Sequence, residues 1–270
     1  AIREVSSLQP YDPPYGWQGF DPLSDFSIID YGDLAFDYAH TPSFPGLLQA
    51  HIAGILAAGP GTVTLGGDHF ITLPILRAYA ERFGPLSLIH FDAHNDVRVM
   101  DHGPTNGTPI RQLLESGLDF DGKNLVQVGI HGFMNSSYYK RWVEGHGGTI
   151  FTGRHIRQNN IIQIAKDALE IAGNGTDSIY ITVDIDVLES AYTPGTGAAS
   201  PEGIHPMDLY EALFIMGQHP KVAAIDFVEH DPSTDVVRIT GRTMTGAVLS
   251  FMSGLFLRRN DGWCGYDQTP

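Results

Sequence analysis

Short apolar runs alternate with longer segments of helical spacing along most of the chain. The apolar runs predict strands at Phe26–Asp30, Thr62–Leu65, Leu86–Phe91, Leu125–Ile130, Thr149–Phe151, Ser178–Val187 and Val222–Val228. The helical spacing predicts helices at Pro45–Ala58, Thr72–Phe83, Pro109–Gly117, Ser137–Gly145, Ile156–Ala172, Pro206–Gly217 and Thr240–Leu257. Because parallel strands need long crossover connections, the alternation predicts an α/β fold with a parallel sheet covered by helices on both faces.

The domain organisation follows from the absence of a linker between these segments. We expect one domain over residues 1–258 and a polar C-terminal arm over residues 259–270. Residues 1–5 look like helix interior without a cap, and the Pro- and Gly-rich residues 9–22 are typical of an irregular loop.

The composition narrows the function classes. The 31 acidic residues outnumber the 16 basic ones, which gives a formal net charge of −15. Such an acidic balance disfavours binding to nucleic acid and to anionic membranes. No apolar run is long enough to span a bilayer, and the single cysteine, Cys264, excludes an internal disulfide framework. We therefore expect a cytoplasmic protein that acts on a small molecule, with no nucleic-acid or membrane partner.

Metal-binding side chains follow the apolar strand at Leu86–Phe91. Asp92, His94 and Asp96 are spaced two residues apart. In extended backbone such side chains point to the same side, so they could converge at the end of a buried strand. Burying unpaired carboxylates is costly, and a bound cation would remove that cost. This stretch therefore predicts a metal site.

A second strand shows the same pattern. Asp184 and Asp186 alternate with apolar residues in the run that ends at Val187. They could instead be solvent-exposed aspartates on an edge strand, but so apolar a strand is typical of a sheet interior. His69 follows another predicted strand. Because the carboxyl ends of parallel strands share one edge of a sheet, all these side chains are expected to meet there.

The combined donor set is four carboxylates and two imidazoles, without a cysteine. Oxygen-rich ligation with some imidazole suits Mn²⁺, and Zn²⁺, Ni²⁺, Co²⁺ or Fe²⁺ stay open. Six donors are too many for one structural ion. Two cations held close together would activate water as a nucleophile at neutral pH.

Three motifs together resemble the signatures of the ureohydrolase superfamily of arginases, agmatinases, guanidino-acid hydrolases and formimidoylglutamases. They are Gly66-Gly67-Asp68-His69, Phe91-Asp92-Ala93-His94-Asn95-Asp96 and Val183-Asp184-Ile185-Asp186-Val187-Leu188. The resemblance implies an arginase-like, three-layer α/β/α fold with a mainly parallel, eight-stranded sheet, and a strand with a Gly-Pro turn before Ala1. It also implies two Mn²⁺ per chain and a homo-oligomer, either a trimer or a hexamer.

The same resemblance implies roles for single residues. His69 and Asp96 would bind one metal, and His94 and Asp186 the other. Asp92 and Asp184 would bridge the two metals. Glu229, in Phe227-Val228-Glu229-His230-Asp231-Pro232, would bind the amidinium group of the substrate. Asp96 would also accept or pass a proton during C–N cleavage.

Departures from the family pattern bear on the substrate. Asn106 stands where arginases and agmatinases carry a proton-shuttling histidine, and Asn cannot titrate near neutral pH. His131, at the end of a predicted strand, could replace that histidine or only cap the strand. Arg98 could pair with a substrate carboxylate or with a ligand aspartate. Asn106 and Arg98 are therefore candidate substrate-binding residues, together with Glu229.

The resulting hypothesis is a dinuclear manganese hydrolase of a linear amidine. We expect it to convert N-formimidoyl-L-glutamate into glutamate and formamide, a reaction of histidine degradation. An agmatinase or guanidino-acid hydrolase that releases urea is the alternative, since Gly67–Pro74 looks closest to agmatinases. Two other classes stay open: a metal-retaining binding or regulatory subunit without efficient turnover, and a single-zinc deacetylase of the same fold.

Overall fold

The sheet is parallel throughout in the computed structural model, which describes residues 26–59, 61–101 and 103–261. In that part of the chain the strand order is β1-β6-β5-β2-β3-β4. The strands are β1 (Val63–Leu65), β2 (Leu86–Phe91), β3 (Leu125–Ile130), β4 (Thr149–Thr152), β5 (Ser178–Asp184) and β6 (Val222–Val228). The α/β class and the parallel sheet are confirmed.

The predicted number of eight strands is wrong for the described residues, where the sheet has 6 strands. The predicted strand at Phe26–Asp30 is also wrong, since no strand is formed there. Ile28 and Ile29 are 55% and 78% exposed. An apolar run becomes a strand only when another strand supplies hydrogen-bond partners, and sequence pattern alone does not report that partner.

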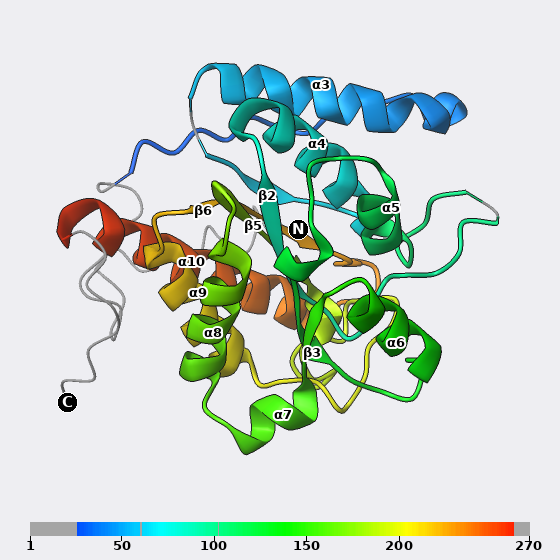
Figure 1. The fold of residues 1–270 in the computed structure, drawn as a ribbon, viewed down its shortest axis with the longest axis vertical. Coiled ribbons are helices and arrows are strands. Elements are labelled where there is room, and N and C mark those ends of the chain that lie inside the picture. The colour runs from blue at the N-terminus through cyan, green and yellow to red at the C-terminus, as the bar shows by residue number, and fades with distance from the viewer. Residues whose placement is uncertain (1–25, 60, 102, 262–270) are drawn as a thin grey trace.

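Helices cover both faces of the sheet (Figure 1). One face packs against α3 (Phe44–Ala57), α4 (Thr72–Phe83), α5 (Pro109–Glu115) and α6 (Ser137–Gly145). The other packs against α7 (Gly153–Gln158), α8 (Ile161–Gly173), α9 (Pro206–Gln218) and α10 (Ile239–Asp261). Short 3₁₀ turns complete the connections at Tyr38–Ser43, His69–Ile71, Gly122–Asn124, Ile185–Val187 and Val236–Arg238. The predicted three layers are therefore present.

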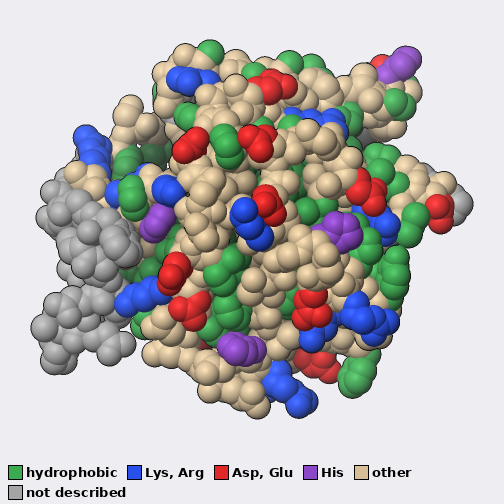
Figure 2. Space-filling model, viewed as in Figure 1, with side chains coloured by type: hydrophobic (Ala, Val, Ile, Leu, Met, Phe, Trp, Pro, Cys, Tyr) green, Lys and Arg blue, Asp and Glu red, His purple; other side chains and the backbone are tan. Residues whose placement is uncertain are grey.

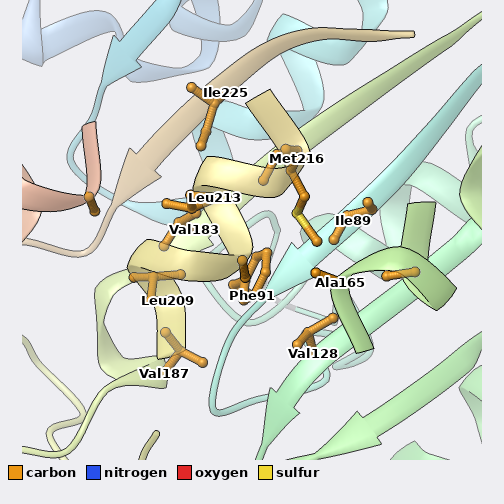
Figure 3. Packing of buried hydrophobic residues seen from close by; sticks show 14 of the residues in the cluster. Ile89, Phe91, Val128, Ala165, Val183, Val187, Leu209, Leu213, Met216 and Ile225 are labelled. Carbon is orange, nitrogen blue, oxygen red and sulfur yellow. The ribbon is translucent and has the colours of Figure 1, made fainter. Parts of the chain in front are cut away.

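The larger core lies between the sheet and the helices α8, α9 and α10. Figure 3 shows Ile89 and Phe91 from β2 and Val183 from β5 packed against Leu213 and Met216 from α9. All five side chains are buried. Because side chains alternate across a strand, the odd-numbered residues of β2 and β5 supply this core. Their even-numbered neighbours point to the face covered by α3 and α4.

Two predicted boundaries need correction. The single helix predicted at Ile156–Ala172 is two helices, α7 and α8. Asn160 breaks it because its side chain accepts a hydrogen bond from the Ile162 backbone N–H and so caps α8. At the C-terminus α10 continues to Asp261, so residues 259–261, which were predicted to belong to a polar arm, are part of the helix. The predictions for residues 1–25 and 262–270 lie outside the described residues.

The distribution of charged side chains on the surface bears on the predicted absence of a nucleic-acid partner. On the face shown in Figure 2, acidic side chains are interspersed with lysine and arginine, and the basic side chains do not form a continuous stripe. Within the described ranges, every helix is too short or too polar to cross a membrane.

Candidate metal centre and active site

The register of the sheet brings the predicted ligands together. Phe91 of β2 pairs with Val183 of β5, and Val183 pairs with Phe227 of β6. Asp92 and Asp184 therefore lie side by side at the carboxyl edge of the sheet. Glu229 lies at the same edge, just beyond the end of β6. Leu65 of β1 also pairs with Phe227, so the loop to His69 starts there too. The predicted meeting of strand ends is confirmed.

The local backbone differs from the extended chain that the sequence suggested. Strands β2 and β5 end at Phe91 and Asp184, and the chain then turns. The Asp92 carboxylate accepts a hydrogen bond from the His94 N–H at 2.5 Å, and Asp184 does the same for Asp186 at 2.9 Å. Aspartates favour such turns because their side chains imitate a backbone acceptor. Turns, rather than alternation along a strand, make these ligands converge.

One cluster surrounds His69, which is completely buried. Its Nδ1 lies 3.2 Å from Asp92 Oδ2, 3.1 Å from Asp96 Oδ2 and 3.3 Å from Asp184 Oδ2. None of these contacts has the direction of a hydrogen bond, so Nδ1 has no partner despite three close oxygens. A buried nitrogen facing three carboxylate oxygens is the arrangement expected around a cation, and the residues fit a metal site.

A second cluster surrounds His94, which is half-buried. Its Nδ1 lies 3.1 Å from Asp186 Oδ2 and 3.3 Å from Asp92 Oδ1. Asp92 therefore directs one oxygen to each cluster, and it belongs to both groups of side chains that could hold an ion. The contacts support the predicted bridging role of Asp92. The contacts of Asp184 give weaker support for its predicted bridging role. Its Oδ2 lies near His69, but its Oδ1 accepts a hydrogen bond from the Asp186 backbone N–H and not from a histidine.

The electrostatics show how strongly the clusters favour positive charge. Burial and the neighbouring charge of Asp92 raise the pKa of Asp96 to about 8. Burial and the charges of Asp186 and Asp92 hold the pKa of the Asp184 carboxyl well above its usual range. Burial opposes the charged form of His94, but the carboxylates of Asp186 and Asp92 raise its pKa to about 11. Bound cations would replace the protons that these groups retain.

The sequence reasoning missed His90, a buried residue of β2. Its Nε2 lies 2.7 Å from Asp92 Oδ2, and its Nδ1 accepts a hydrogen bond from the Gln127 amide at 2.9 Å. Because an amide N–H can only donate, His90 Nδ1 carries the lone pair and Nε2 carries the proton. His90 therefore donates to Asp92 and is not a ligand. The signal was present in the sequence, since His90 and Asp92 are two residues apart on one strand.

Two predicted site residues adopt a left-handed backbone that non-glycine residues rarely take. Asp96 has φ 53° and Glu229 has φ 64°. The Asp96 carbonyl accepts from Ile110 N at 3.2 Å, at the start of α5. The Glu229 carboxylate accepts from His69 N at 2.7 Å. Such conformations cost about 1–3 kcal/mol each and persist where surrounding contacts enforce them, which is common at functional sites.

The predicted substrate residues lie at the rim of this cluster. Asn106 is exposed, and its amide donates to Glu229 Oε2 at 3.4 Å. The adjacent Gly107 lies under the Arg98 side chain, so closely that a Cβ there would sit 2.8 Å from Arg98 Cδ. Arg98 N also donates to the Gly107 carbonyl at 2.9 Å. Arg98 is exposed and forms no ion pair with any described residue. Pairing with a ligand aspartate is therefore not observed.

His131 is held by the backbone. Its Nδ1 lies 2.7 Å from the Gly129 carbonyl and must donate to it, while its Nε2 has no hydrogen-bond partner. His131 N donates to the Ala93 carbonyl at 3.0 Å, which places this residue beside the loop that carries Asp92 and His94. The structure does not bring its imidazole into hydrogen-bond contact with a ligand. Its predicted role as a proton shuttle stays a prediction.

Comparison with known proteins identifies the family. A family model described as the arginase family matches residues 1–254. The chain belongs to the arginase family. The formimidoylglutamase of Halalkalibacterium halodurans is 38% identical over 235 residues, which are 86% of this chain and 73% of that protein. The agmatinase of Proteus mirabilis is 31% identical over 256 residues, which are 93% of this chain and 77% of that protein.

Solved structures of family members have the same fold. The crystal structure of Bacillus subtilis formimidoylglutamase matches with a TM-score of 0.88 and 32% identity over 95% of this chain and 79% of its own. Trypanosoma cruzi formiminoglutamase with Mn²⁺ matches with a TM-score of 0.75 and 25% identity over 83% of this chain and 73% of its own. The predicted ureohydrolase resemblance and the predicted hydrolase of amidine or guanidino C–N bonds are confirmed.

Proposed function

We propose that this chain hydrolyses N-formimidoyl-L-glutamate to glutamate and formamide with two Mn²⁺ ions as cofactors. The observation that carries the choice of substrate is Arg98. This residue is exposed, forms no ion pair with any described residue, and lies over Gly107, next to the Asn106–Glu229 pair at the cluster. A substrate carboxylate could pair with it bidentately. Agmatine has no carboxylate and would bring a second cation to the arginine.

The cofactor proposal is supported by the donor set. His69 and Asp96 would hold one ion, His94 and Asp186 the other, and Asp92 and Asp184 would be shared. Carboxylates with imidazoles suit Mn²⁺, the ion in the related T. cruzi structure. When bound, two such ions lower the pKa of water and supply a nucleophile at neutral pH.

The protein's own groups would bind and orient the substrate. The Glu229 carboxylate would accept hydrogen bonds from the amidinium nitrogens and fix the amidine carbon over the cluster. Arg98 would hold a carboxylate at the other end of the substrate. After water adds to the amidine carbon, the C–N bond to the glutamate nitrogen breaks, and that nitrogen takes a proton that Asp96 accepts and passes on. The carbon retains its second nitrogen and leaves as formamide.

A steady-state assay with Mn²⁺ on three substrates tests the proposal. We expect kcat/KM to be highest for N-formimidoyl-L-glutamate, with formamide as the product. 4-Guanidinobutyrate has a carboxylate but a guanidinium group, and agmatine has neither a carboxylate nor a formimidoyl group. Turnover of agmatine but not of formimidoylglutamate would overturn the proposed substrate. No turnover of any substrate by protein that binds two Mn²⁺ would favour a binding or regulatory subunit. Trimer or hexamer assembly and a cytoplasmic location stay predictions.

A further inference from the structure

Asp226 is a buried carboxylate that the proposed chemistry does not use. It lies in the middle of β6 with no solvent exposure. Among the described residues, the other buried carboxylates all belong to the six predicted ligands. No lysine, arginine or histidine in this part of the chain forms an ion pair with it. A buried carboxylate without a partner is costly, so its contacts should explain why it is there.

Three hydroxyl groups surround Asp226. Tyr180 Oη donates to its Oδ2 at 2.9 Å, and Thr72 Oγ1 donates to the same oxygen at 3.0 Å. Thr182 donates to Oδ1 through a short hydrogen bond. The sheet register fixes the last contact, because Thr182 of β5 pairs directly with Asp226 of β6. The three hydroxyls satisfy the carboxylate, and one of them leads to the metal cluster.

Thr182 connects Asp226 to the ligand histidine. Its Oγ1 lies 3.0 Å from Nε2 of His69. A hydroxyl has a single proton, and Thr182 donates that proton to Asp226. It can therefore only accept from His69, so Nε2 must carry a proton. The neutral imidazole then has its lone pair on Nδ1, the atom that faces the oxygens of Asp92, Asp96 and Asp184.

We infer that Asp226 is a positioning residue that acts through Thr182 to fix the tautomer and orientation of His69. The inference rests on the metal site of the proposed function. A carboxylate behind a ligand histidine holds the ring in place and makes its free nitrogen a better donor to a cation. Losing such a partner typically weakens metal binding about 10–100-fold. The effect should fall on the ion held by His69, since no hydrogen bond or ion pair among the described residues joins His94 to Thr182 or Asp226.

The test is Mn²⁺ titration of the metal-free full-length chain by calorimetry, which needs no substrate. Asp226→Asn keeps the shape but removes the charge, and Thr182→Val removes the connecting hydroxyl. Each should weaken one of two Mn²⁺ sites about 10–100-fold and leave the other within about 3-fold. The double variant should lose no more than the stronger single variant, because both changes break the same chain of hydrogen bonds.

Two further variants separate positioning from general packing. Tyr180→Phe removes another buried hydroxyl from Asp226 but leaves the link to His69, so both Mn²⁺ affinities should stay within about 3-fold of the wild type. Thr182→Ser keeps the hydroxyl and should retain both affinities where Thr182→Val loses one. The Thr182 pair tests the inference even if Asp226→Asn does not fold, which the melting temperature of the metal-free protein reports.

Three outcomes would overturn the inference. They are unchanged Mn²⁺ affinities in both Asp226→Asn and Thr182→Val, an equal loss in Tyr180→Phe, or a wild-type chain that binds no Mn²⁺. Failure of the proposed substrate looks different. In that case the wild type binds Mn²⁺ at two sites, the variants weaken one of them, and formimidoylglutamate is still not hydrolysed.

Discussion

The metal cluster and the substrate rim are built in opposite ways. In the cluster, five of the six predicted ligands are buried, and His90, Thr182 and backbone N–H groups hold them by hydrogen bonds. At the rim, Arg98 and Asn106 are exposed, and the hydrogen bond from the Asn106 amide to Glu229 is 3.4 Å long. Substitutions in a buried set of side chains that hydrogen-bond to one another are expected to be strongly destabilising, whereas substitutions in an exposed loop have little effect on stability. The difference indicates that the cluster determines the chemistry and the rim determines the substrate.

Asp184→Ala is the most direct test of the idea that the buried cluster determines the chemistry. Removing a ligand shared by two cations should abolish tight metal binding and lower kcat/KM by a factor of at least about 1,000, or roughly 4 kcal/mol. Metal content after gel filtration and steady-state kinetics measure both effects. Asp177→Ala is a matched control, because Asp177 is an exposed aspartate before the opposite end of the same strand. Two retained cations in Asp184→Ala would disprove the shared-ligand assignment.

The pH dependence of the metal-free protein tests how strongly the cluster needs positive charge. The folded pKa of His94, about 11, lies above its unfolded value, so its contribution to stability is complete below pH 6.5 and is lost as the pH rises. Asp96 has a folded pKa of about 8, so the folded state also retains its proton and loses stability with rising pH.

The raised pKa values of His94 and Asp96 therefore both predict that the stability of the metal-free protein falls as the pH rises. Between pH 6.5 and 8, we expect the free energy of unfolding of the metal-free protein to fall by about 3 kcal/mol, roughly half of it from each group, given about 1.4 kcal/mol per pKa unit. Urea denaturation at fixed ionic strength measures it. Saturating Mn²⁺ should reverse the trend, because deprotonated ligands bind cations better. A metal-free stability that is constant or rises over this range would show that the cluster does not retain its protons.

The same contrast accounts for what the sequence could and could not predict. Strands β2, β3 and β6 match their predicted bounds because short, mostly apolar runs are typical of a buried parallel sheet. The cluster of candidate ligands could be expected from the sequence because carboxylates at the ends of buried strands are costly unless they bind a cation. The turns at Asp92 and Asp184 were missed, since they depend on side chains bonding to their own backbone. Asp226 looked like an ordinary strand residue, because its partners Thr72 and Tyr180 are distant in the sequence.

The rim side is tested by Arg98→Ala. If Arg98 binds a substrate carboxylate, its loss should raise KM for formimidoylglutamate about 10-fold or more, since a charge-assisted hydrogen bond contributes about 1.5–3 kcal/mol. KM for any agmatine turnover should change less than about 2-fold, because that substrate has no carboxylate for this charge-assisted contact. Arg82→Ala is the control, because Arg82 is exposed at the far end of α4. Equal changes for the two substrates would indicate a structural role for Arg98.

The smallest effect is expected for Asn106→Ala. Asn106 is exposed and contacts Glu229 through a hydrogen bond at the limit of useful length, so its loss should cost a few tenths of a kcal/mol and lower kcat/KM less than about 3-fold. The acid limb of the kcat/KM profile against pH should stay in place, because an amide does not titrate. His131→Asn should shift that limb if His131 moves the proton. A decrease in kcat/KM of about 30-fold or more in Asn106→Ala would instead show that Asn106 helps to hold Glu229 in place. Asn106 would then belong with the buried cluster and not with the exposed rim.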